Sequence, residues 1–188
     1  MDSSNVPPFH RLLSFYSNRN LHDSQTIRLQ DSIAGNLALG LDFPVALGIA
    51  VGRHLFLKNT AFFSLQIHVP SVPWKTTPLV GLDVDEKKGY SCSEIAGLAR
   101  ERLGVVGVVE AVGLWNLAAD VETGLLRGAD VERFKQGTVF QELERRRKDR
   151  SQVLPLWRGG PISVTGHSWA VEKIWGVHVY RDGDGKGK

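Results

Sequence analysis

A basic segment near the end of the chain holds the densest group of side chains able to act on a partner. Residues 141–150 read Gln-Glu-Leu-Glu-Arg-Arg-Arg-Lys-Asp-Arg and carry five of the 23 Lys and Arg side chains. Clustered basic side chains gain from counterion release on a polyanion and from the negative potential of anionic lipid. The segment therefore predicts binding to a polyanionic surface, either nucleic acid or an anionic membrane.

The alternative for this segment is a solvated helix face that pairs with itself. In a helix, Glu142 faces Arg146 and Glu144 faces Lys148 at i,i+4, in the order that favours ion pairing. Part of the positive charge is then neutralised within the helix. The basic residues left least compensated by this pairing are Arg145, Arg147 and Arg150.

A serine nucleophile is the next chemistry to consider. Residues 166–170 read Gly-His-Ser-Trp-Ala after a short apolar stretch, which is similar to the sharp turn that exposes the serine of α/β-hydrolases. The last position is Ala rather than Gly, and His178 and Asp182 follow Ser168 in the wrong order for that fold. We therefore interpret the run as a turn between two strands.

Metal-binding patterns are weak in this sequence. Asp83 and Asp85 follow an apolar stretch and offer hard oxygens to a divalent cation, but a polar hairpin turn has the same composition. Asp182 and Asp184 begin like a calcium loop, yet Lys186 stands at the third ligand position. The six histidines lack the close spacing to Cys or carboxylates that zinc sites show. We expect no metal site, no cofactor and no enzyme activity.

Composition limits the classes of protein that are compatible with this chain. At 188 residues and 42% hydrophobic content, it is long enough for one buried core. The net charge of +3 is mild, so binding to a polyanion has to depend on a local patch. Cys92 is the single cysteine, which indicates a reducing compartment. The longest apolar stretch, residues 43–51, is too short to span a bilayer, and the amino terminus lacks the pattern of a secretory signal.

The chain is expected to comprise one domain between two loose ends. Residues 1–32 are rich in Ser, Asn, Asp and Pro without a steady apolar period, so we predict a flexible arm. Residues 181–188 are charged and Gly-rich, and we predict a disordered basic tail. The stretch between them, residues 33–180, has the usual size of a single compact domain.

Apolar patterning then predicts mixed secondary structure. A helix is expected from Ser91 or Ser93 to Gly104, and a second one over residues 130–150 with a break at Gly137 and Thr138. Strands are expected over residues 43–57, 61–69, 79–84, 162–164 and 171–180. A strand is also favoured over residues 105–117, although periodicity alone leaves a helix over residues 111–119 open. This order predicts an α+β fold with a mainly antiparallel sheet and two or three helices.

The order of elements resembles the matrix proteins of rhabdoviruses. The residues that carry the resemblance are the aromatic-led stretch 62–69, then Ser71, Pro73, Trp74 and Thr76, then Tyr90-Ser91 opening an alanine-rich helix, and finally Ile162 to Tyr180 followed by Arg181-Asp182. The arm departs from the family pattern, because it lacks a lysine-rich run and has Pro7-Pro8-Phe9-His10 where many animal-virus members have Pro-Pro-x-Tyr.

The resemblance implies a non-enzymatic assembly protein that associates with itself, with an anionic lipid membrane and with a nucleocapsid or its RNA. It implies a location in the virion and in the host cytoplasm or at the inner membrane face, and we expect no secretion. The anionic-surface residues expected from their charge are Arg11, Arg19, Arg145, Arg146, Arg147, Lys148 and Arg150.

Two other functions remain open. One is sequence-independent RNA binding, as in a viral silencing suppressor, because a basic surface binds duplex RNA as well as lipid. The other is a small enzyme whose active site combines residues that are distant in sequence, for instance Asp83, His68 and Ser168. A pocket in which such groups converge would favour the enzyme.

Overall fold

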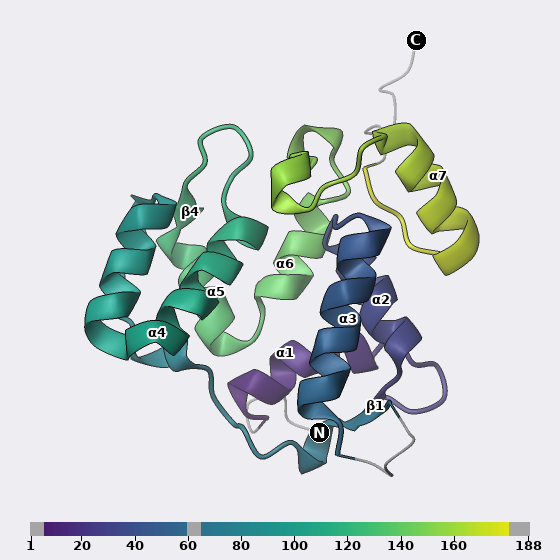
Figure 1. Ribbon diagram of the computed structural model, residues 1–188, viewed down its shortest axis with the longest axis horizontal. Coiled ribbons are helices and arrows are strands. Elements are labelled where there is room, and N and C mark those ends of the chain that lie inside the picture. The colour runs from purple at the N-terminus through teal and green to yellow at the C-terminus, as the bar shows by residue number, and fades with distance from the viewer. Residues whose placement is uncertain (1–5, 60–64, 181–188) are drawn as a thin grey trace. The chain divides into compact units, whose positions relative to one another are not determined.

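The computed structural model describes residues 6–59 and 65–180, and these residues are mostly helical (Figure 1). They form seven α-helices, namely α1 (Pro8–Ser17), α2 (Leu29–Ala38), α3 (Phe43–Leu57), α4 (Cys92–Ala118), α5 (Gly128–Gln136), α6 (Val139–Arg146) and α7 (Val164–Trp175). Four 3₁₀ turns accompany them, η2 (Val69–Ser71), η3 (Pro78–Gly81), η4 (Arg150–Gln152) and η5 (Leu156–Arg158).

Strand pairing is confined to two short ladders among the described residues. Strand β1 (Thr26–Ile27) pairs antiparallel with β2 (Ile67–His68), and β3 (Gly89–Tyr90) pairs antiparallel with β4 (Leu126–Arg127). Helix, with the 3₁₀ turns included, accounts for 61% of the described residues. The expected α+β fold with a mainly antiparallel sheet and two or three helices is therefore wrong.

The chain divides into two compact units. Unit 1 combines the described parts of residues 1–12 and 74–140, and unit 2 combines those of residues 13–73 and 141–188. Helices α1 and α6 run across the boundaries between the units. The sequence predicted one domain over residues 33–180, and the structure distributes those residues over both units.

Helix α3 replaces the strand expected over residues 43–57. Asp42 caps its amino terminus by accepting a hydrogen bond from the Phe43 N–H, and Pro44 lies in the first turn, where a missing N–H costs nothing. Ala46, Ala50 and His54 recur every four residues and are fully buried. The segment is apolar on every side, so its pattern alone did not separate a helix from a strand.

Helix α4 begins as predicted, is kinked at Gly104, and has a second helical segment after the kink. Ser91 and Glu94 form a capping box, in which each side chain accepts from the other residue's N–H. Gly104 was expected to end the helix, and the backbone does leave the helical conformation there (φ 69°, ψ −160°), so α4 consists of two helical segments joined at a kink. Residues 105–118 form the second segment instead of the expected strand. The small residues Gly107 and Ala111 make up part of the buried face of that continuation, which overrides the β preference of its valines.

Helix α7 occupies residues expected to be a turn and a strand. Ser163 caps it by accepting from the Gly166 N–H, and Gly176 ends it with a left-handed φ of 63°. His167 and Val171 are buried one helical turn apart. The Gly-His-Ser-Trp-Ala run therefore lies inside a helix, and the interpretation as a turn between two strands is wrong.

Two neighbouring helices confirm most of the prediction for residues 130–150, although α6 ends at Arg146. Helix α5 ends at Gly137, whose left-handed φ of 80° suits glycine, and α6 starts two residues later at Val139. An added Cβ at Gly137 would meet the Pro8 carbonyl and the Arg11 side chain within unit 1. The break between the helices is thus fixed both by the chain's local conformation and by packing.

Residues 6–32, which fall within the expected arm, form α1, β1 and the start of α2. Leu12, Leu13, Phe15 and Tyr16 are buried, because helix formation brings these scattered apolar residues onto a common side. Residues 1–5 and the expected tail 181–188 lie outside the described residues.

In unit 2, α2 packs on α3. Ile33 and Leu37 of α2 are buried, as are Ala46 and Ala50 of α3. Asn36 is also buried and donates from Nδ2 to the Ala46 carbonyl at 2.8 Å, which satisfies its amide inside the core. This packing leaves the opposite side of α3 uncovered within unit 2.

Candidate functional site

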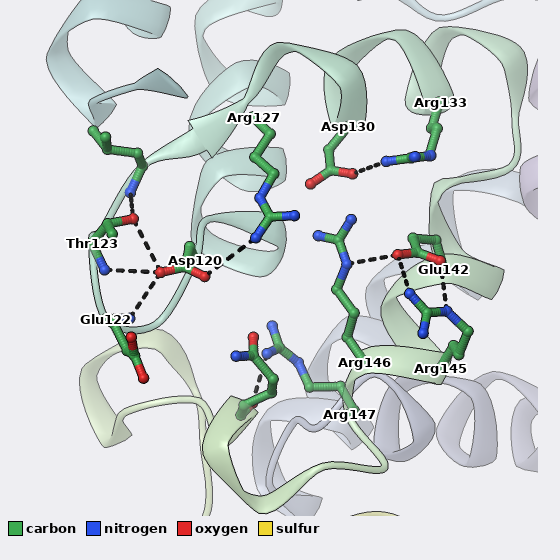
Figure 2. Close-up of polar contacts among 12 residues, drawn as sticks. Asp120, Glu122, Thr123, Arg127, Asp130, Arg133, Glu142, Arg145, Arg146 and Arg147 are labelled. Carbon is green, nitrogen blue, oxygen red and sulfur yellow. Dashed lines mark hydrogen bonds and ion pairs between the residues drawn. The ribbon is translucent and has the colours of Figure 1, made fainter. Parts of the chain in front are cut away.

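The basic residues of α6 are paired within unit 2. Arg145 donates from Nε and Nη2 to the two oxygens of Glu142 at 2.9 and 2.8 Å, and Arg146 Nε donates to Glu142 Oε1 at 2.8 Å (Figure 2). The Arg145 hydrogen bonds, followed by those of Arg146, hold the pKa of Glu142 at about 2. The Arg145 side chain nevertheless remains 71% exposed, so its charge faces solvent.

Arg147 has a different position from its neighbours. It is 2% exposed, and its guanidinium donates from Nε to the Leu39 carbonyl at 3.2 Å and from Nη1 to the Gln152 carbonyl at 2.6 Å. Tyr180 joins the same cluster, because its N–H donates to the Arg147 carbonyl and its hydroxyl donates to the Gly40 carbonyl, both at 2.8 Å. Arg147 thus ties the end of α2 to the C-terminal segment of unit 2.

The remaining predicted residues differ in exposure. Lys148 and Arg150 are exposed, and Arg150 Nε donates to the Tyr180 carbonyl at 3.2 Å. Arg19 is mostly buried, pairs with Glu144 at 2.9 Å and lies over the Phe15 ring at 4.8 Å. Arg11 is half-buried in α1. The exposed cations among the seven predicted residues are therefore Arg145, Lys148 and Arg150.

In unit 1, the carboxylate of Asp120 interacts with residues that follow it closely in the chain. Asp120 Oδ1 accepts from the N–H groups of Glu122 and Thr123 at 3.1 and 2.9 Å, and Oδ2 lies 3.7 Å from Arg127 Nη2 (Figure 2). The Thr123 N–H is the largest cause of the lowered pKa of Asp120. Among the residues that the structure describes, no group of three or more His, Cys, Asp or Glu side chains is placed to hold a metal ion.

The three residues of the hypothetical active site, Asp83, His68 and Ser168, are distributed over both units. Asp83 belongs to unit 1, whereas His68 and Ser168 belong to unit 2. The His68 N–H donates to Asn59 Oδ1 at 2.8 Å, and Asn59 Nδ2 donates to the His68 carbonyl at 2.9 Å. The Ser168 hydroxyl in α7 is buried and finds no hydrogen-bond partner among the described residues. Within unit 2, no hydrogen bond among the described residues joins Ser168 to His68.

The outward face of α3 is a feature that sequence reasoning missed. Val45, Ile49 and Phe56 are spaced i, i+4 and i+11, and they are 38%, 44% and 83% exposed. Leu55 lies beside them and is 58% exposed. Gly48 and Gly52 belong to the same helix, and an added Cβ at either would meet no other atom within 4 Å. We call Val45, Ile49, Leu55 and Phe56, with these two glycines, the α3 apolar face.

The charged residues of α3 do not interrupt this face. Arg53 is turned toward α1 and α2, where its guanidinium lies 3.7 Å from the Tyr16 ring and donates to Asn36 Oδ1 at 3.1 Å. Lys58 follows as the C-cap residue and is exposed. The sequence signal that could have found this face is an apolar 15-residue run with Arg53 as its one Lys or Arg, because a helix buried on one side only normally has a polar side opposite.

Two further findings bear on the site. No helix within the described ranges has both the length and the apolar character needed to cross a membrane. No family model, no curated protein and no solved structure matches this chain, so the resemblance to rhabdovirus matrix proteins stays a prediction.

Proposed function

We propose that the protein binds the surface of an anionic lipid membrane through the α3 apolar face. The observation that supports this proposal is a helix whose charged side chain, Arg53, is turned inward and whose outward face is apolar and uncovered within unit 2. A helix of this composition is found either in a core or in contact with lipid. The proposal keeps the non-enzymatic, membrane-associated role that the sequence predicted.

The length of α3 favours an orientation in the plane of the membrane. Fifteen residues at about 1.5 Å each give roughly 22 Å, which is less than the ~30 Å of a bilayer's hydrocarbon core. Amphipathic helices that lie in the interface bury one face at the boundary between headgroups and acyl chains. Here the buried face of α3 packs on unit 2 and the α3 apolar face contacts lipid.

The apolar contact alone gives weak binding. The four side chains of the α3 apolar face have a combined exposed area equal to roughly two whole side chains, and burying that area contributes about 3–6 kcal/mol. Such a free energy corresponds to a dissociation constant weaker than about 10 μM. Basic side chains at the surface of anionic lipid add about 1 kcal/mol each, and Lys58 adjoins the face. Attachment that is reversible and sensitive to salt is the expected behaviour.

Vesicle binding by the full chain tests this proposal. We expect co-sedimentation with vesicles of phosphatidylcholine and phosphatidylserine, and a weaker association when phosphatidylserine is left out or salt is raised. Phe56→Glu should reduce binding about tenfold or more, because a carboxylate replaces the most exposed apolar side chain of the face. Ile162→Glu is the matched control, since Ile162 is also 83% exposed and lies outside α3.

Three results would contradict the proposal or part of it. If Phe56→Glu and Ile162→Glu reduce binding equally, the α3 apolar face is not the contact. If binding is the same at low and high salt, the anionic component is wrong. If duplex RNA displaces the vesicles and binds more tightly, sequence-independent RNA binding becomes the better description. Self-association and contact with a ribonucleoprotein remain predictions, and these measurements do not test them.

A further inference from the structure

A small pocket lies between the start of α3 and one face of α7, entirely within unit 2. Its volume is about 320 Å³, toward the small end of ligand-binding pockets. Asp42 and Phe43 line one side, and His167, Val171, Ile174 and Trp175 line the other. We call it the Asp42 pocket. It is distinct from the α3 apolar face, because it includes none of the four side chains that define that face.

The Asp42 carboxylate is only partly engaged in the protein. Its Oδ1 accepts from the Phe43 N–H at 2.9 Å and lies 3.2 Å from His167 Nδ1. The other oxygen, Oδ2, has no hydrogen-bond partner among the described residues, and the side chain is 26% exposed. One carboxylate oxygen is thus available to a ligand.

Among the described residues that line the pocket, Asp42 is acidic and none is Lys or Arg. Carboxylate oxygens accept hydrogen bonds, so Nδ1 of neutral His167 carries the proton toward Asp42. Burial lowers the pKa of His167, although the nearby Asp42 opposes this effect. The lowered pKa keeps the imidazole neutral near pH 7. A second pocket shares Ile174 and Trp175 with this one, but it is lined by Arg19, whose charge is balanced by Glu144.

Two aromatic rings complete the lining. The ring centroids of Phe43 and Trp175 lie 6.4 Å apart with an angle of 36° between the planes. Aromatic faces attract cations, and groups of such rings are a recurrent means of recognising quaternary ammonium ligands. The remaining contacts are aliphatic, from Val171 and Ile174. A ligand that fits therefore combines a positive charge with an apolar surface.

We propose that the Asp42 pocket binds a quaternary ammonium group of the choline type. A primary ammonium group needs acceptors for three hydrogen bonds, whereas Asp42 Oδ2 is the one uncommitted carboxylate oxygen here. A trimethylammonium group donates no conventional hydrogen bonds and spreads its charge over methyl groups, which suit aromatic and aliphatic walls. The proposal does not rest on lipid binding by the α3 apolar face, although a phosphatidylcholine headgroup carries the same ammonium group as free choline.

Calorimetric titration of the full chain with choline chloride tests this inference. The control ligand is 3,3-dimethylbutan-1-ol, which has the shape of choline without its charge and should bind at least about tenfold more weakly. Asp42→Asn removes the charge and keeps a good helix cap, and it should weaken choline binding about tenfold. Trp175→Leu should weaken it several-fold. Trp169→Leu, a change at an exposed residue of the same helix, should have no effect.

Equal binding of choline and its uncharged analogue would overturn the proposal, and so would unchanged choline affinity in Asp42→Asn. If that variant does not fold, Trp175→Leu and the analogue provide the same test. Phosphatidylcholine vesicles distinguish the two sources of the group. Competition between choline and these vesicles supports a headgroup ligand, binding of choline alone supports a soluble ligand, and binding of neither refutes the site. If Phe56→Glu leaves binding to anionic vesicles unchanged while the protein still binds choline, only the proposal for the α3 apolar face is refuted.

Discussion

Acidification should destabilise unit 2 mainly through one buried histidine, His54. This residue is fully buried in α3, and its Nε2 lies 2.9 Å from the Ser32 hydroxyl. Burial is the largest cause that lowers its pKa from 6.5 to about 4, and the nearby Arg53 charge acts in the same direction. A protonated imidazolium would have to remain in the apolar contact between α2 and α3.

The sign and size of the effect follow from linkage. Because the folded-state pKa is below the unfolded value, the unfolded chain binds a proton first, and stability falls as pH decreases from 6.5 toward about 4. The difference of 6.5 − 4 pKa units corresponds to about 3 kcal/mol at 1.36 kcal/mol per unit. The loss approaches ~1.4 kcal/mol per pH unit within this window. His167, whose pKa is also lowered by burial, acts in the same direction.

Urea unfolding followed by circular dichroism at several pH values measures this dependence. His54→Gln keeps a group able to hydrogen bond to Ser32 but cannot titrate, so its free energy of unfolding should change less between about pH 7 and about pH 4.5 than that of the wild type. His22→Gln, at an exposed position, is the control and should follow the wild type. If His54→Gln and the wild type show the same pH slope, the buried neutral histidine is the wrong explanation.

Three further changes test the packing of each unit. Arg147→Met should lower the free energy of unfolding of unit 2 by about 2–4 kcal/mol, because it leaves the Leu39 and Gln152 carbonyls without their donor, and chemical denaturation measures this loss. Ser91→Ala should cost about 1 kcal/mol by removing the cap of α4, visible as a lower Tm, and an unchanged Tm would argue against the capping box. Gly128→Ala should destabilise unit 1 by about 2 kcal/mol or more, because its Cβ would clash with the Asp85 carbonyl, and a stability equal to the wild type in thermal unfolding would contradict that close approach.

The basic segment illustrates how far the sequence alone reached at the candidate site. The i,i+4 pairing of Glu142 with Arg146 was predicted and is confirmed at 2.8 Å. Glu144 was expected to face Lys148, but it pairs with Arg19, which is distant in sequence and is brought near by folding. Arg147, which spacing left uncompensated, is buried against backbone carbonyls. Helix spacing identifies partners on the same helix, and it carries no information about partners on other elements.

The α3 apolar face and the Asp42 pocket depend wholly on the fold. Asp42 and His167 are separated by more than a hundred positions in the chain, and neither belongs to a motif that pairs them. The expected strand over residues 43–57 also placed alternate side chains on opposite faces, so the common exposure of Val45, Ile49 and Phe56 had no counterpart in the prediction.

Local chemistry in the sequence determined the start of α4 at Ser91 and the break at Gly137, because caps and left-handed glycines act within a few residues. Tertiary structure decided the helical state of residues 43–57, 105–118 and 164–175. An apolar or valine-rich stretch buries similar surface as a helix or as a strand, so its state depends on what packs against it. In α3 the partner is α2, which contacts the side bearing Ala46 and Ala50 and leaves the α3 apolar face uncovered in unit 2.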